Sequence, residues 1–159
     1  MGTVEPATIA ALIGIAVLLV VSAFTSASEV ALFSLSATHL RDLQERGGAP
    51  GSKVLELLSK PRRLLATILV TNNFANVGIT VLSTIAITGL FDLAAMTEKV
   101  AFIIQVVAVT TVILLLGEVL PKVYATFDPV RVARWMSGPL VTLRGFFWPL
   151  SETLVRSSR

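Results

Sequence analysis

The chain has no cysteine and a single histidine, His39, among its 159 residues. The lack of cysteine excludes disulfides, thiolate catalysis and thiolate metal ligands, and one histidine argues against a histidine-rich zinc or iron site. Charged side chains are also scarce, at 14% of the sequence. Any metal chemistry in this chain therefore depends on oxygen ligands.

The sequence is rich in apolar residues instead. Hydrophobic residues make up 54% of the chain and the mean hydropathy is +0.82, values that exclude an ordinary soluble domain and indicate an integral membrane domain. The net charge of +3 would suggest nucleic acid as a partner of a soluble protein. Here the basic residues flank apolar segments, which membrane topology alone explains, so no nucleic-acid partner is expected.

Three apolar segments approach the length of about 20 residues that a bilayer core requires, at residues 7–33, 64–90 and 100–120. A cleaved signal peptide is the competing interpretation of the first segment. No basic residue precedes that segment, and its apolar stretch is too long, so we expect a retained helix. The fold class predicted from these patterns is an all-α integral membrane domain.

Basic residues are distributed unevenly around these segments. The connection over residues 34–63 contains six, the part after the third span also contains six, and the loop over residues 91–99 contains only Lys99. The positive-inside rule then predicts that the first connection and the C-terminus are cytoplasmic and that the N-terminus is outside.

The first connection, residues 36–60, is predicted to form a helical hairpin at the cytoplasmic membrane surface. Ser36 is expected to cap a first short helix and Ser52 a second one, with a break at residues 47–51 between them. After the third span, Pro121 is expected to end or kink the helix. Asp128 and Pro129 then open a last helix, predicted over residues 129–157.

This last helix mixes Trp135 and several aliphatic residues with Arg131 and Arg134, which is typical of an amphipathic helix at the headgroup boundary. A fourth membrane span is the rival interpretation. The charges at Arg131, Arg134, Arg144 and Glu152 leave no clean stretch of about 18 apolar residues, which favours the interfacial helix.

Polar residues inside the apolar segments are the candidates for function, because an unpaired polar group in hydrocarbon costs several kcal/mol, roughly. On the first span, Ser22, Ser26 and Glu29 stand at i, i+4 and i+7 and share one helical face. On the second span, Asn73 and Asn76 are i and i+3 and also share a face, from which Asn72 is offset by about 100°.

On the third span, Gly117 and Glu118 precede Pro121, and both the glycine and the proline weaken the regular hydrogen-bond ladder. Backbone carbonyls there become available to a ligand. Each patch also has a simpler explanation, such as close helix packing for the serines, or snorkelling or capping for the carboxylates. Three oxygen-rich patches on three helices are together better explained by a site for a hard cation, and the ligand types leave Mg²⁺, Ca²⁺ and Na⁺ open.

Four segments in this order resemble the transmembrane domain, also called DUF21, of the CorC/CNNM family. They are Ser26-Ala-Ser-Glu-Val-Ala-Leu-Phe-Ser-Leu35, the basic hairpin with Gly47-Gly-Ala49, Pro61-Arg-Arg-Leu-Leu-Ala-Thr-Ile-Leu-Val-Thr-Asn-Asn73, and Gly117-Glu-Val-Leu-Pro-Lys122. The resemblance covers nearly the whole chain.

The resemblance implies a multi-pass plasma-membrane Mg²⁺ transporter that exports Mg²⁺ in exchange for Na⁺. Its protomer would have three membrane helices and a helical hairpin, and it would assemble as a homodimer. Members of the family generally continue into cytosolic CBS modules that bind adenine nucleotide. This chain stops at Arg159 without them, so it is expected to be the membrane domain of a longer protein, and no nucleotide site is assigned to it.

Carried over by motif, the family's Mg²⁺ ligands are implied at these positions: Ser22, Ser26, Asn73, Asn76, the Gly117 carbonyl and Glu118. Glu29 is added as a ligand, a coupling group or a nearby charge, and these alternatives stay open. A membrane Mg²⁺ sensor or scaffold that regulates another transporter, and a purely structural dimer, are the competing functions. An enzyme is disfavoured because no nucleophile–base pair is evident.

Overall fold

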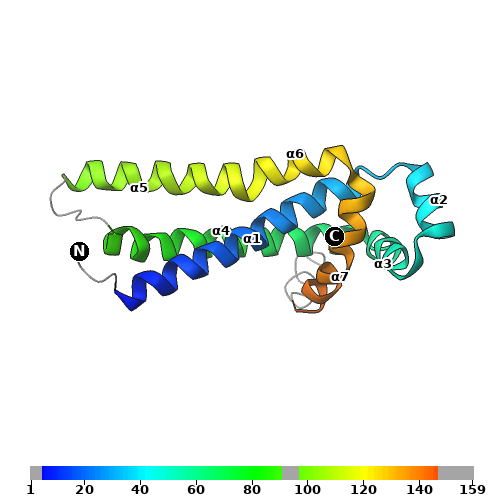
Figure 1. Ribbon diagram of the computed structural model, residues 1–159, viewed down its shortest axis with the longest axis horizontal. Helices are drawn as coiled ribbons and strands as arrows, with labels where there is room; N and C mark the ends of the chain where they lie inside the picture. The colour runs from blue at the N-terminus through cyan, green and yellow to red at the C-terminus, as the bar shows by residue number, and fades with distance from the viewer. Residues whose placement is uncertain (1–4, 91–96, 147–159) are drawn as a thin grey trace.

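The computed structural model describes residues 5–90 and 97–146, and in those ranges helices are joined by short connections. Their order is α1 (Pro6–Phe33), α2 (Ala37–Arg46), α3 (Gly48–Leu58), α4 (Pro61–Leu90), α5 (Glu98–Val112), the π-helix η2 (Ile113–Val119), α6 (Leu120–Phe127) and α7 (Pro129–Phe146). In Figure 1, α1, α4 and the continuous α5–η2–α6 helix run along the long axis, while α2, α3 and α7 lie at one end. We call this end the basic end.

Three helices are long and apolar enough to cross a membrane: Pro6–Phe33, Pro61–Leu90 and Lys99–Phe127. The predicted all-α membrane fold with three spans is therefore confirmed. The first two spans match their predicted ranges closely. The third was predicted to end or kink at Pro121, but its helix continues to Phe127.

The third span passes through Pro121 because the helix widens just before it. In η2 the backbone bonds skip one more residue than in an α-helix, as when the Leu120 N–H donates to the Leu115 carbonyl. Pro121 then occupies the first turn of α6, where a missing N–H is tolerated. The predicted weakening of the ladder thus appears as a π-helix rather than as a helix end.

The first two spans approach each other closely at the end opposite the basic end. A Cβ atom built on Gly89 of α4 would overlap the Oγ1 atom of Thr8 on α1. Glycine therefore permits this contact, as small residues commonly do between membrane helices. On the other side of α4, the Gln105 amide of α5 donates to the Thr84 hydroxyl at 2.9 Å, which ties the third span to the second.

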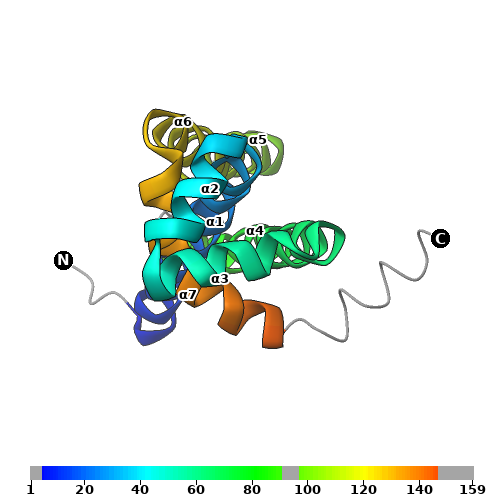
Figure 2. The same ribbon diagram turned by 90° about the vertical axis from the view of Figure 1, so that its right-hand side faces the viewer.

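The basic end has its own apolar core, to which all three spans and the three short helices contribute. Its buried side chains come from α1, α2, α3, α4, α6 and α7: Ala27, Ala31, Leu32, Leu43, Val54, Leu57, Leu64, Ile68, Ala125, Val132, Ala133 and Leu140. Figure 2 shows α2, α3 and α7 grouped across the end of the bundle. This packing holds the hairpin and α7 on the spans.

The hairpin forms where it was predicted, with one correction. Ser36 caps α2 through a capping box, in which its hydroxyl accepts from the His39 N–H and its own N–H donates to His39 Nδ1. Ser52 was predicted to cap the second helix, and this was wrong, because α3 already begins at Gly48. The Ser52 hydroxyl donates to the Gly48 carbonyl at 3.1 Å, and Pro50 lies in the first turn, where proline fits.

The last helix begins as predicted. The Asp128 carboxylate accepts from the Arg131 N–H at 3.1 Å, and α7 opens with Pro129. The helix is described to Phe146, and the remainder of the predicted 129–157 range lies outside the described residues. In Figure 1 α7 runs across the bundle axis, so the described part of this helix is not a fourth span.

Candidate metal centre

Polar groups from all three spans meet at Ser22, which lies on α1 and is completely buried. Its Oγ is 2.8 Å from Asn72 Oδ1 and 3.0 Å from Asn76 Oδ1, both on α4. The Gly117 carbonyl oxygen, in η2, is 3.4 Å away. Three acceptor oxygens therefore converge on one hydroxyl group.

This arrangement has fewer protons than acceptors. A serine hydroxyl carries one hydrogen and can donate fully to only one of the three oxygens at a time. The other two oxygens face the same point without that donor, in a region where water is scarce. A group of oxygens in this arrangement attracts a cation, because a cation can satisfy all of them together.

The orientation of both asparagines is fixed by Glu118 of η2. The Asn76 amide nitrogen is 3.0 Å from Glu118 Oε1, and the Asn72 amide nitrogen is 3.5 Å from the same oxygen. Flipping either amide would bring its oxygen against the carboxylate and its nitrogen away from it. The carboxylate thus directs both amide oxygens toward Ser22.

Gly117 lies where η2 packs closely against Ser22 of α1. A Cβ atom at this position would lie 2.9 Å from Ser22 Oγ and 3.4 Å from Ser22 Cβ, closer than packed side chains allow. In a regular α-helix the Gly117 carbonyl would accept from residue 121, which is a proline without an N–H. Both features leave this carbonyl oxygen available at the centre.

Ser26 lies one turn further along α1 on the same face as Ser22. Its side chain is buried, and its Oγ atom has no hydrogen-bond partner among the residues that the structure describes. An unsatisfied buried hydroxyl costs about 1–3 kcal/mol, so a further partner is expected for it. Between the two serines, Thr25 directs its Oγ1 to within 3.4 Å of Asn72 Oδ1.

Five of the seven predicted metal-site residues fit this cluster: Ser22, Asn76, Gly117 and Glu118 are in contact, and Ser26 adjoins them. The other two predicted residues, Asn73 and Glu29, lie outside the cluster. Asn73 is exposed on the neighbouring face of α4. Glu29 forms an ion pair with Lys122 of α6 at 3.2 Å, and both side chains are about 40% exposed.

Two residues of the cluster were not among those predicted. Asn72 was set aside because it is offset from Asn73, yet Asn72 and Asn76 are i and i+4 and therefore lie on one face. The same spacing relates Ser22 to Ser26, and this match between the two helices is the signal that could have selected Asn72. Thr25 stands at i+3 from Ser22, and this spacing could have indicated it. Its hydroxyl also bonds to the carbonyls of Val21 and Ser22 on its own helix.

The cluster carries little charge. Among residues 5–90 and 97–146, no group of three or more histidine or acidic side chains is placed to hold a metal. Glu118 is its one carboxylate, and the charges of Glu29 and Lys122 offset each other. Hydroxyl, amide and carbonyl oxygens with one carboxylate form a ligand set for a hard cation, of the kind that binds less tightly than carboxylate-rich sites.

Comparison with known proteins extends this description. Residues 13–159 match the model of the cyclin M transmembrane N-terminal domain. A UPF0053 protein of Haemophilus influenzae is 33% identical over 132 residues, which is 83% of this chain and 30% of that protein. The UPF0053 inner membrane protein YfjD of Escherichia coli is 33% identical over 130 residues, 82% of this chain and 29% of that protein.

A similar match is found in plants. A chloroplast protein of Arabidopsis thaliana, named for its DUF21 domain, is 32% identical over 141 residues, which is 88% of this chain and 20% of that protein. The chain thus spans less than a third of the length of these curated relatives.

Proposed function

The chain belongs to the cyclin M transmembrane N-terminal domain family, and on this premise we propose that it carries Mg²⁺ across the membrane through the cluster around Ser22. The observation that supports this proposal most is the convergence of three acceptor oxygens on one hydroxyl. A cation placed among them would satisfy the oxygens that a single proton cannot.

The ligand set suits Mg²⁺ in kind and in number. Asn72, Asn76, the Gly117 carbonyl and Ser22 supply four oxygens, and the Ser26 hydroxyl and the Glu118 carboxylate would complete a set of six. Mg²⁺ prefers six oxygens in an octahedral arrangement and gives up its water reluctantly. Protein oxygens that replace this water shell would favour the divalent ion, and the single carboxylate would keep binding weak enough for release.

Movement of the third span would open and close this site. The Gly117 carbonyl belongs to η2, and π-helical turns are frequent at functional sites. If η2 changes to a regular α-helical turn, Gly117 and Glu118 rotate relative to Ser22 and Asn76. This change would detach two ligands at once and expose the ion to one side of the membrane, as alternating access requires.

The remaining parts of the function come from the family and from the charge distribution. We propose export driven by Na⁺, a homodimer as the working unit, and control by cytosolic CBS modules in the full-length protein. The E. coli relative is named as an inner membrane protein, so we place this chain in the cell membrane. From the uneven distribution of basic residues we propose that the basic end is cytoplasmic and the N-terminus outside.

The test compares two asparagines on one helix. Asn76→Ala removes a cluster oxygen, and Asn73→Ala makes the same chemical change on the exposed face of α4. Both variants are reconstituted in liposomes with an internal Mg²⁺ dye, with and without a Na⁺ gradient. We expect Asn76→Ala to lose most of the Mg²⁺ flux and Asn73→Ala to keep it.

Equal flux in Asn76→Ala and wild type, in protein that still folds, would refute the assignment of transport to this cluster. Loss of flux in Asn73→Ala alone would show that the ion uses the other face of α4. Saturable Mg²⁺ protection against unfolding without any flux in the wild type would instead identify a membrane Mg²⁺ sensor.

A further inference from the structure

A second polar feature lies at the basic end, away from the cluster. A pocket of about 400 Å³ is lined by Pro50 at the start of α3 and by residues where α7 begins, namely Asp128, Val130, Arg131, Arg134 and Trp135. The proposed transport mechanism does not use any of these side chains. Two of them are cationic, so the pocket is suited to an anion.

The two arginines of the pocket are free to bind such an anion. Arg131 and Arg134 are i and i+3 on α7, so their guanidinium groups share one face, and both are exposed. Neither forms an ion pair in the part of the chain that the structure describes, whereas Arg144 on the same helix is paired with Glu56 of α3. The Asp128 carboxylate in the pocket already accepts a hydrogen bond from the backbone N–H of Arg131.

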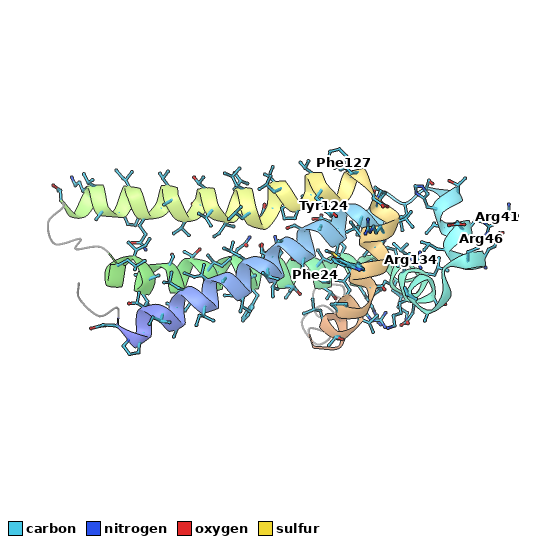
Figure 3. The ribbon with its side chains drawn as sticks, viewed as in Figure 1. Phe24, Arg41, Arg46, Tyr124, Phe127 and Arg134 are labelled. Carbon is cyan, nitrogen blue, oxygen red and sulfur yellow. The ribbon has the colours of Figure 1, made fainter. Side chains whose placement is uncertain are left out.

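Exposed aromatic residues place this pocket at the membrane surface. Trp135 in the pocket is 83% exposed, and Phe127 and Tyr124 at the end of the third span are 81% and 65% exposed. Large aromatic side chains exposed at the end of a membrane helix are typical of the headgroup layer. Figure 3 shows Tyr124, Phe127 and Arg134 where α6 turns into α7, while Arg41 and Arg46 lie on α2, at the tip of the hairpin.

We propose that this pocket binds the phosphate of an anionic phospholipid headgroup. Arg131 and Arg134 would hold the phosphate oxygens through paired N–H donors, and Trp135 would lie against the glycerol and the upper part of the acyl chains. A lipid is favoured over a soluble phosphate because a single residue, Asp128, separates the pocket's helix from the end of a membrane span. The exposed aromatic ring beside the arginines gives a lipid additional apolar contact.

Lipid bound here would stabilise the basic end. On its opposite side α7 buries Val132, Ala133 and Leu140 in the core shared with α1, α3 and α4. A headgroup held by two residues of α7 would therefore fix this helix, and the core that it covers, to the membrane surface. Headgroup binding in this pocket does not require that the chain transports Mg²⁺.

The test uses the 159-residue chain purified in a neutral detergent, with phosphatidylglycerol, phosphatidylcholine or inorganic phosphate added. Arg131→Gln/Arg134→Gln removes the two pocket cations, and Arg41→Gln/Arg46→Gln removes the same charge from the hairpin tip. We expect phosphatidylglycerol to raise the unfolding temperature of wild type and of the hairpin variant, and most of that shift to be lost in the pocket variant. Phosphatidylcholine and inorganic phosphate should have little effect on any of them.

A second readout reports the location of the lipid directly. In a Trp148→Phe background, Trp135 is the one remaining tryptophan, and brominated phosphatidylglycerol should quench its fluorescence more than brominated phosphatidylcholine does. The pocket variant should lose this difference even if its stability has changed. Equal responses of the two double variants would overturn the proposal, and protection by inorganic phosphate equal to that by lipid would show a soluble-phosphate site instead.

Discussion

Replacing Gly117 by alanine tests the geometry of the cluster with the smallest possible change. The added Cβ would lie 2.9 Å from Ser22 Oγ and 3.4 Å from Ser22 Cβ. Ser22 is buried and short, so its oxygen can move only by rotating away from Asn72 and Asn76 or by shifting α1 away from η2. Either movement disrupts the convergence of oxygens on which the proposed site depends.

Two opposing effects set the stability of Gly117→Ala. Overpacking of a tight interior contact typically costs about 1–3 kcal/mol. Alanine is favoured over glycine in a helix by up to about 1 kcal/mol. We therefore expect a net loss of about 1 kcal/mol in the free energy of unfolding, with steric overlap exceeding helix propensity.

The assay is thermal unfolding in detergent with and without Mg²⁺. A ligand at about 100 times its Kd stabilises the protein by about 2.7 kcal/mol, and we expect Gly117→Ala to lose most of this protection. Gly78→Ala is the matched control, because its Cβ would meet the Leu18 Cδ1 atom at 2.6 Å, outside the cluster and at the end of a flexible side chain. That variant should keep the protection by Mg²⁺. Full protection in Gly117→Ala together with unchanged stability would refute the proposed packing of η2 against Ser22.

Three further outcomes follow from contacts described above. Pro121→Ala supplies an N–H that bonds to the Gly117 carbonyl once this turn adopts α-helical pitch, so we expect unchanged or higher thermal stability but a weaker protection by Mg²⁺; stronger protection would contradict the role given to this carbonyl. Ser36→Ala removes the cap of α2 and should cost about 1 kcal/mol in unfolding free energy, whereas Ser52→Ala, at the residue that caps no helix, should cost less in the same measurement. The Arg144 hydrogen bond and charge lower the pKa of Glu56 below its ordinary value of 4.5, so this pair stabilises the fold above pH 4.5 and its contribution is lost as the pH falls through the lowered pKa. The unfolding temperatures of wild type and Glu56→Gln should therefore differ at pH 7 and converge in acid; a difference that persists at low pH would show that the carboxylate charge is not involved.

Much of the architecture was predictable because membrane spans can be recognised from the length and hydropathy of their sequence segments. The three spans, the capping role of Ser36 and the start of α7 at Asp128 and Pro129 all follow from local sequence rules, and the structure confirms them. The start of α3 was missed because two adjacent glycines and Pro50 were interpreted as a break. Proline in a first helical turn costs little, and the turn could form there.

The cluster was predictable by residue type but not by side-chain direction. Asn72 and Asn73 are adjacent in sequence and differ only in which face of α4 they occupy. That face is selected by where α1 crosses α4, a tertiary property that the sequence indicates only through the i, i+4 spacing shared by Ser22 and Ser26 and by Asn72 and Asn76. Glu29 was similarly undetermined, because the choice between the cluster and an ion pair depended on Lys122, which lies in a different helix.

The π-helix also fixes the rotational phase of the third span. Because each residue of an α-helix turns the chain by about 100°, a change of Ile113–Val119 to α-helical pitch with all its residues kept would rotate everything beyond it by about that angle. Lys122 would then no longer face Glu29, and Ala125 would leave the buried core. The wide turn of η2 therefore absorbs one residue more than an α-helix with the same rise and rotation would contain, and in this way both halves of the third span keep the face that they present to α1.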